Sequence, residues 1–244
     1  MAPPDKDDVG KVGGLLPVDA QAPADVIADE MLSRVFASEA DASDFVLETM
    51  QNDPRPEVQA KGCSAISQIA EKREGRALLH SKSVVDVVVA AMLSAMAEEV
   101  ELQIKGCSAL ANLVIGEGDD AVLRKGGLEA VLNASRMHPN VPAVQRKVCL
   151  ALGNMAYSSF GEARVVAEGG IQVVLTAMKT HGSDPEVQEE GIDALVNLAD
   201  SENGKKELLA RGGLGVVAAA KKHEKCAAAA GDLANALVAV AKAA

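Results

Sequence analysis

The feature that most constrains this chain is an internal repeat of about 43 residues. Four stretches superimpose around glutamines that lie 44, 42 and 43 residues apart: Gln59, Gln103, Gln145 and Gln188. In each stretch the apolar positions recur at intervals of 4, 7, 8 and 11 residues, which is the stripe of an amphipathic helix. In the first stretch they are Val58, Gly62, Ala65, Ile66 and Ile69. A repeat of this length predicts helical units that stack into one continuous domain.

Prolines and glycines mark the helix boundaries inside each unit. Proline stands just before three of the stretches, where its fixed φ suits a first helical turn: Pro56, Pro142 and Pro185. Short upstream helices are expected around Leu79, Val122, Val165 and Leu208. Glycine pairs follow the last three and offer the positive φ that ends a helix: Gly126-Gly127, Gly169-Gly170 and Gly212-Gly213. Each repeat is therefore predicted to contain three helices.

The repeat length also sets the domain organisation. A polar leader, residues 1–23, contains proline and glycine and is predicted to be disordered. The remaining 221 or so residues accommodate about five repeats of 43. The predicted repeats are 24–72, 73–116, 117–159, 160–202 and 203–244.

The long helix of each unit ends in Ala-Leu-x-Asn-Leu or a near variant, at residues 109–113, 151–155 and 194–198. With the three-helix unit and the Gly-Gly-Leu/Ile junctions, this motif resembles the armadillo repeat family over roughly residues 25–244. The resemblance implies an all-α fold, a right-handed α-solenoid of three-helix repeats. HEAT-type solenoids share the same physics.

Composition excludes several classes of function. The net charge of −11 and an aromatic content of 2% disfavour nucleic acid as a partner. The longest apolar run, from Val84 to Met96, carries Asp86 and Ser94 and suits a buried helix, so membrane insertion is not expected. The N-terminal residues lack a signal-peptide pattern, and the four cysteines fit a reducing compartment. We therefore expect an intracellular protein of the cytoplasm, with the nucleus as the alternative.

The cysteines and histidines do not predict a metal site or an active site. Cys63, Cys107 and Cys149 fall in one repeat column, and stacked helices separate them by about 10 Å, too far to share a zinc ion. Core packing is the expected role of these cysteines. The histidine column is expected to interact with helix dipoles at the ends of the second helices: His138, His181 and His223. No catalytic motif is present, so we predict neither enzyme activity nor a cofactor nor a bound metal.

A row of amide side chains is the main candidate site. It consists of Gln68, Asn112, Asn154 and Asn197, with Asn235 added if the last repeat is about four residues shorter. In armadillo proteins this position lines a concave groove, and the resemblance implies that these amides hold the main chain of an extended peptide. The alternative is that the amides cap or brace neighbouring helix ends. Both interpretations remain open from the sequence.

Lysines accompany the amides, seven residues earlier on the same helix face: Lys61, Lys105 and Lys147, followed by Glu190. Tyr157 is the one aromatic residue expected at this surface. Where the family commonly places tryptophan, this chain has Ser64, Ser108, Leu150 and Asp193, which disfavours capture of basic localisation signals. The lysines resemble the basic groove of β-catenin-type armadillo proteins, which implies an acidic partner. The alternative is that they are simply solvated.

The sequence thus predicts a non-enzymatic adaptor or scaffold that binds an extended, acidic segment of another protein in its concave groove. The competing hypothesis is a structural subunit of a large assembly that uses its convex surface and C-terminal end. Residues 226–244 are mostly alanine and valine, with Asp232 and Lys242 as the charged side chains. Since solenoid ends normally carry a polar cap, self-association or further repeats are expected at this end.

Overall fold

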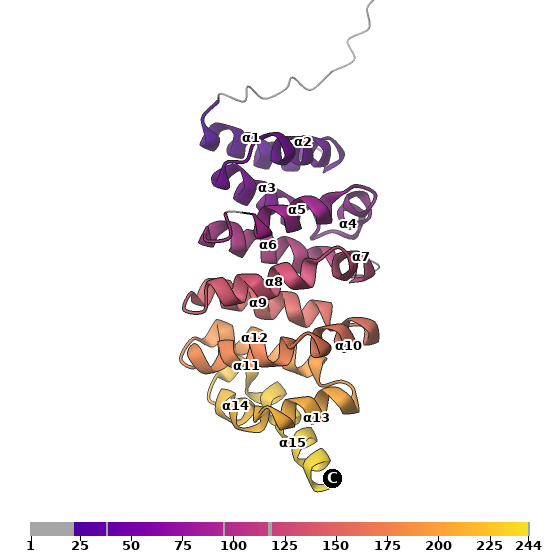
Figure 1. Ribbon diagram of the computed structural model, residues 1–244, viewed down its shortest axis with the longest axis vertical. Coiled ribbons are helices and arrows are strands. Elements are labelled where there is room, and N and C mark those ends of the chain that lie inside the picture. Colours follow the sequence, from indigo (N-terminus) through magenta and orange to yellow (C-terminus); the bar gives the residue numbers. More distant parts are fainter. Residues whose placement is uncertain (1–21, 38, 95, 117–118, 244) are drawn as a thin grey trace, which may run out of the picture.

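The computed structural model describes residues 22–243, except 38, 95 and 117–118. All regular structure within these ranges is helical, and the helices stack into an elongated array (Figure 1). The array begins with α1 (Ala24–Ala37), α2 (Glu39–Asn52) and α3 (Pro56–Ile69). Three helices then recur in fixed order: α4 (Arg73–His80), α5 (Val84–Leu93), α6 (Val100–Leu113), α7 (Asp119–Arg124), α8 (Gly127–Met137), α9 (Pro142–Met155), α10 (Ser159–Ala167), α11 (Gly170–Thr180), α12 (Pro185–Leu198), α13 (Glu202–Ala210), α14 (Gly213–Ala220), the 3₁₀ turn η1 (Glu224–Cys226) and α15 (Ala227–Ala243).

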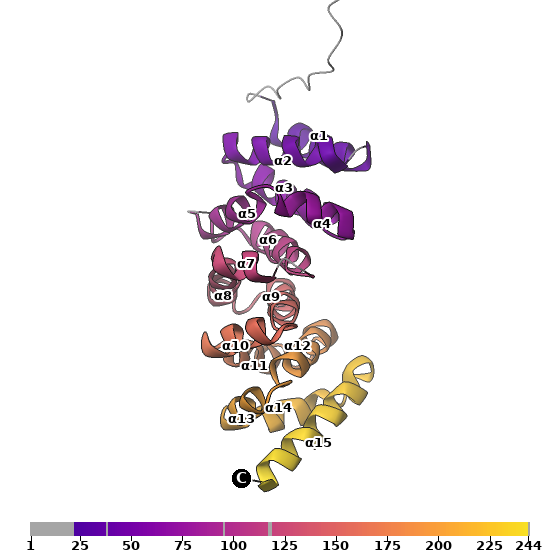
Figure 2. The same ribbon diagram turned by 90° about the vertical axis from the view of Figure 1, so that its right-hand side faces the viewer.

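The long helices α3, α6, α9 and α12 pack against one another in succession and form the continuous layer of the array. The first and second helices of each unit cover this layer (Figure 2). At the N-terminal end α1 packs on α3, as α3 packs on α6, while α2 packs on α3, α4 and α5. The predicted all-α solenoid is confirmed. The repeat boundaries remain predictions, and almost all of the predicted leader lies outside the described residues.

The helix boundaries follow the signals in the sequence. Pro56, Pro142 and Pro185 are the first residues of α3, α9 and α12. The first glycine of each pair has a positive φ, between 73° and 86°, and precedes a second helix: Gly126, Gly169 and Gly212. A residue with a Cβ would be strained in this backbone conformation.

The core is one contiguous cluster that runs through all the repeats. Long and second helices approach closely where a glycine faces a methionine. A Cβ at Gly106 would lie 2.5 Å from Met92 Cγ, and Gly62 and Gly191 face Met50 and Met178 in the same way. In the third unit the same two columns hold Val148 and Ser135, so the larger side chain lies on the long helix instead of the second helix. Total volume is thereby roughly conserved, which cores tolerate well.

The four glutamines that mark the repeat are buried and fasten the long helix to the second helix. Each side chain Nε2 donates to carbonyl oxygens at the end of the preceding helix. Gln145 bonds Ser135 O at 3.0 Å and His138 O at 2.9 Å, and Gln188 bonds Met178 O at 2.8 Å. Gln59 and Gln103 make equivalent bonds. These bonds satisfy carbonyl groups that a helix end leaves without partners.

The histidine column joins successive repeats. Nε2 of each ring lies within hydrogen-bond distance of a carbonyl oxygen 41 or 42 residues earlier: His138 to Ala97 O at 2.8 Å, His181 to Pro139 O at 3.0 Å and His223 to Gly182 O at 3.2 Å. Because a carbonyl only accepts, Nε2 carries the proton. The rings lie near the ends of the second helices, as predicted from the sequence. The structure shows in addition that each ring bonds a carbonyl oxygen of the preceding repeat.

The last helix departs from the pattern. In Figure 2, α15 runs obliquely to the other long helices, and it packs on α13 and α14 as well as α12. Val238 on this helix is 36% exposed. The stretch Glu224–Ala243 is long and apolar enough to cross a membrane by length and composition, and 28% of that window is buried in the array. It contains α15, the last helix that the structure describes.

Candidate functional site

The row of asparagines lies near the C-terminal ends of α6, α9 and α12, half-buried between successive long helices. Asn154 Nδ2 donates to Ala111 O at 2.9 Å, and Asn197 Nδ2 donates to Gly153 O at 3.0 Å. Asn112 Nδ2 bonds both the carbonyl and the hydroxyl oxygen of Ser67 at 3.0 Å. Each acceptor directly precedes the previous member of the row. The amides therefore brace adjacent repeats, as the bracing interpretation expected.

Bracing leaves part of each amide free. An amide NH₂ has two donors and its oxygen accepts two bonds. Asn154 and Asn197 each use one donor, and within the described residues their Oδ1 atoms accept no hydrogen bond. One donor and one acceptor per side chain thus remain for a ligand main chain. The two ends of the row differ: Gln68 is half-buried and Asn235 is exposed, and neither makes the bracing bond.

The lysine row lies on the same helices, toward their N-terminal halves. Lys61 on α3 is exposed, whereas Lys105 on α6 and Lys147 on α9 are half-exposed. Lys105 Nζ lies 3.5 Å from Glu101 Oε1, and both side chains are more than a third exposed. Exposed pairs of this kind contribute about 0–1 kcal/mol, so the contact is easily exchanged.

Lys147 is the lysine of the row whose pKa is shifted by its surroundings. Burial lowers its pKa, the neighbouring Arg146 and Lys105 lower it further, and Glu190 and Glu186 oppose the shift in part. The influence of Lys105 on this pKa means that the two lysines are close enough to repel each other. Positive charge therefore accumulates along α6 and α9 in a chain with a net charge of −11.

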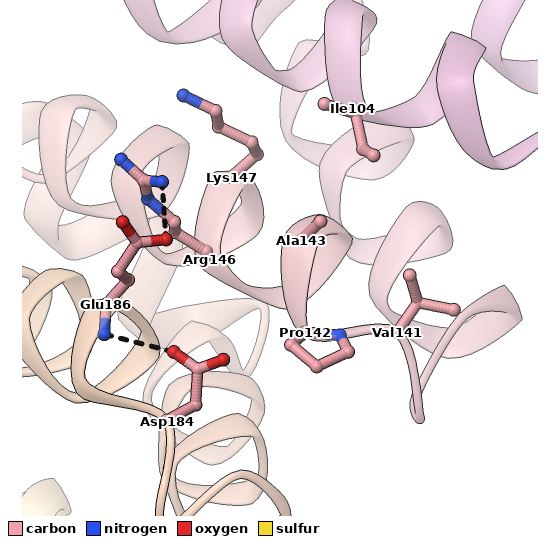
Figure 3. Close-up of a pocket in the computed structure, with 8 residues that line it drawn as sticks. All are labelled: Ile104, Val141, Pro142, Ala143, Arg146, Lys147, Asp184 and Glu186. Carbon is pink, nitrogen blue, oxygen red and sulfur yellow. Dashed lines mark hydrogen bonds and ion pairs between the residues drawn. The ribbon is translucent and has the colours of Figure 1, made fainter.

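A hollow of about 450 Å³ lies beside Lys147, lined by Ile104, Val141, Pro142, Ala143, Arg146, Lys147, Asp184 and Glu186 (Figure 3). Its acidic groups are already engaged. Arg146 Nη1 lies 2.8 Å from Glu186 Oε2, and Asp184 accepts from two backbone N–H groups at the start of α12. In Figure 3 the Lys147 side chain extends past Arg146, away from Glu186 and Asp184. Its amine therefore points away from these two carboxylates.

A second hollow, which the sequence did not predict, lies on the other side of the amide row. It has a volume of about 490 Å³ and is lined by Val114, Ile115, Gly116, Asn154, Tyr157 and Ser158. Tyr157 is 84% exposed and Ile115 is 42% exposed. The structure thus brings Asn154 and Tyr157 together and adds Ile115. The sequence signal that could have indicated this hollow is the column three residues after each amide. This column holds apolar or aromatic side chains in the two middle repeats and carboxylates in the outer ones: Glu71, Ile115, Tyr157 and Asp200.

The face changes character at α12. Glu190 occupies the lysine column there, and burial raises its pKa. Asp193 stands in the column where the family commonly has tryptophan, and burial and Glu189 raise its pKa. The basic part of the face is therefore confined to α3, α6 and α9.

The cysteines take no part in this surface. Cys63, Cys107 and Cys149 are fully buried, and burial raises the pKa of each thiol to about 12. Among the described residues no group of three or more histidine, cysteine or acidic side chains is arranged to hold a metal ion.

The chain is similar to several engineered proteins of known structure. Two engineered proteins share 21% and 22% identity with it, with TM-scores of 0.75 and 0.76. The alignments cover 88% and 93% of this chain, and 91% and 94% of those proteins. A designed armadillo repeat protein, solved in complex with a (KR)4 peptide, has 19% identity, a TM-score of 0.70 and 89% coverage of both chains. No curated protein matches the sequence.

The family comparison extends over most of the sequence. The model that describes the LRRK2 ARM repeat matches residues 22–225. Proteins with this fold are typically non-enzymatic scaffolds that bind other proteins, so the fold supports a protein-interaction module. The chain belongs to the LRRK2 ARM repeat family.

Proposed function

We propose that this protein is a non-enzymatic adaptor that holds an extended, acidic segment of a partner protein along the face of α3, α6, α9 and α12. The observation that carries the proposal is the alignment of three lysines, Lys61, Lys105 and Lys147, beside the amide row. Burial and neighbouring positive charge disfavour the charged form of Lys147, and a carboxylate from a ligand would favour it. Such complementarity favours an acidic partner and raises its association rate.

The binding free energies indicate how much of the affinity the amides can supply and how much must come from peptide side chains. Hydrogen bonds from Asn154 and Asn197 to a peptide main chain contribute about 1 kcal/mol each. Micromolar affinity requires roughly 8 kcal/mol, so charges and side-chain contacts must supply most of the free energy. The amides would fix the direction and path of the peptide, and its side chains would determine specificity.

The proposal also includes the cellular location of the protein and the class of its partner. All four cysteines are free thiols, which suits a reducing compartment, and we propose an intracellular, cytoplasmic location. The net charge of −11 supports a protein partner over nucleic acid.

The test compares two charge-matched variants in an affinity capture from cell extract, with quantitative mass spectrometry at 50 and 200 mM salt. Lys105→Glu/Lys147→Glu alters the groove, whereas Lys179→Glu/Lys206→Glu alters exposed lysines on α11 and α13. The first variant should lose the main partner and the second should keep it, and salt should weaken the wild-type capture. Equal capture by both variants would contradict the proposal.

A structural subunit of a large assembly is the second candidate. The exposed apolar surface of α15, including Val238, favours this function because soluble array ends normally carry polar residues. Size-exclusion chromatography of extracts distinguishes the two. A large native assembly that survives Lys105→Glu/Lys147→Glu and is lost with Val238→Asp would support the structural subunit.

A further inference from the structure

We propose that the groove selects a peptide in which one large apolar side chain, seated between Ile115 and Tyr157, is flanked by acidic residues that face Lys105 and Lys147. This inference rests on the proposed function and deepens it, because it specifies the sequence pattern of the partner segment. The geometry of α6 and α9 carries the argument.

The amide row separates two different walls. On α9, Lys147 lies seven residues before Asn154, or about 10 Å along the helix axis and on the same face. Tyr157 lies three residues after Asn154, just beyond the end of α9. On α6 the same order holds for Lys105, Asn112 and Ile115. One wall of the groove is therefore basic, and the other is apolar.

An extended peptide that follows the amide row contacts the basic wall and the apolar wall at the same time. Its successive side chains point to opposite sides at intervals of about 3.3 Å. Neighbouring long helices are about 10 Å apart, so an apolar side chain between Ile115 and Tyr157 has neighbours in the sequence that point to the lysines. The minimal pattern is acidic, apolar, acidic.

The second hollow has the chemistry of an anchor site for an aliphatic or aromatic side chain. Its volume of about 490 Å³ is sufficient, and Tyr157 presents most of its ring to solvent. Asn154 lines the same hollow with its unused donor and acceptor. Ser158 Oγ accepts a bond from Gly161 N at 3.0 Å, which leaves its hydroxyl hydrogen able to donate to the peptide.

Among the described amide positions from Gln68 to Asn197, one register of the groove offers this combination. The column that holds Ile115 and Tyr157 carries Glu71 after α3 and Asp200 after α12. A carboxylate at either position would be unfavourable beside an apolar side chain and would repel an acidic peptide. The apolar anchor is therefore confined to the junction of α6 and α9, which also carries Lys105 and Lys147.

The experiment selects a displayed library of random 12-residue peptides on the full-length protein and measures the affinity of the best peptides by fluorescence anisotropy. Enriched peptides should share a leucine, isoleucine or phenylalanine with an acidic residue on each side. Tyr157→Ser and Ile115→Ser should each weaken binding at least tenfold. The matched control is Phe160→Ser, because Phe160 is 43% exposed on α10 and does not line the hollow. Circular dichroism checks that all variants are folded.

The outcomes separate this inference from the proposed function. Peptides whose binding depends on Lys105 and Lys147 but not on Tyr157 or Ile115 would overturn the apolar anchor and leave the acidic-segment adaptor intact. Enrichment of basic peptides, or of none, would overturn both. A variant without residues 1–21 that binds at least tenfold more tightly, or a dimer that the peptide dissociates, would assign the hollow to the chain's own leader or to a second copy.

Discussion

Replacing Gln145 with leucine tests how the long helices are held in place. The side chain is 2% exposed and makes three hydrogen bonds. Its Nε2 donates to Ser135 O at 3.0 Å and to His138 O at 2.9 Å, and its Oε1 accepts from Ser135 Oγ at 2.9 Å. These bonds tie the end of α8 to α9, two residues before Lys147 in the sequence. Leucine has a similar volume and makes none of them.

The expected loss of stability is about 2–4 kcal/mol. Each hydrogen bond contributes about 1 kcal/mol net, and a buried acceptor left without a partner costs about 1–3 kcal/mol. The half-exposed Ser135 hydroxyl can bond water instead, and burial of the leucine offsets part of the cost. Gln103→Leu is the matched control. Gln103 Nε2 makes one bond, at 3.1 Å to Met92 O, and its buried Oε1 has no partner, so its replacement should change stability by less than about 1 kcal/mol.

Urea unfolding followed by circular dichroism measures the midpoint for each variant. Because repeat arrays can unfold in parts, hydrogen exchange of the α8 and α9 amides should be recorded as well. Gln145→Leu should lower the midpoint and the protection of these helices, and Gln103→Leu should leave both almost unchanged. An equal decrease of the urea midpoint in the two variants, or no decrease in either, would refute the argument that the Gln145 hydrogen bonds stabilise the contact between α8 and α9.

Three further predictions concern single positions. Native Cys149 should resist iodoacetamide at pH 8, since a thiol pKa of about 12 leaves about one thiolate in ten thousand; rapid labelling without unfolding would contradict this. Lys147 should titrate by NMR below the ordinary lysine value of about 10.4. Wild-type stability should therefore rise relative to Lys147→Met as the pH increases through this lowered pKa, and a flat difference would contradict it. Gly153→Ala should destabilise by about 1–3 kcal/mol in urea melts, because its Cβ would lie 3.0 Å from Ala194 Cα. The control Gly215→Ala has open space and should stabilise α14 by about 0.5–1 kcal/mol; similar effects at both glycines would exclude close helix packing as the cause.

Most of the fold could be predicted because its signals are local. The prolines before the long helices and the glycines with positive φ act on one or two residues of backbone, and the structure confirms them. Core packing was the role expected for Cys149 from the cysteine column, and the residue is fully buried. The glutamine row was visible as a spacing, but its role was missed. An amide on a buried stripe must find partners, and that rule could have indicated the bonds to the preceding helix.

The candidate site was harder to predict because it depends on distances between repeats. Whether Asn154 binds a ligand or braces a helix could not be decided from its spacing alone. The structure shows that one of its donors braces the preceding repeat and that the other remains free. The second hollow arises where Ile115 and Tyr157, which lie 42 residues apart, meet across a repeat junction. Asn235 matched the motif in sequence, but the oblique course of α15 leaves it exposed and outside the bracing pattern.

Within the described part of the chain, the sequence separations show that bonds between repeats reach one repeat away. The bracing asparagines span 43 to 45 residues, and the histidines span 41 or 42. The ion pairs Lys82–Asp44 and Lys125–Asp86 follow the same rule. Under tension between its ends, such an array behaves as springs in series, because every junction carries the same force and extends independently. A partner peptide that bridges several junctions would therefore resist their extension and stiffen the array along the stretch that it occupies.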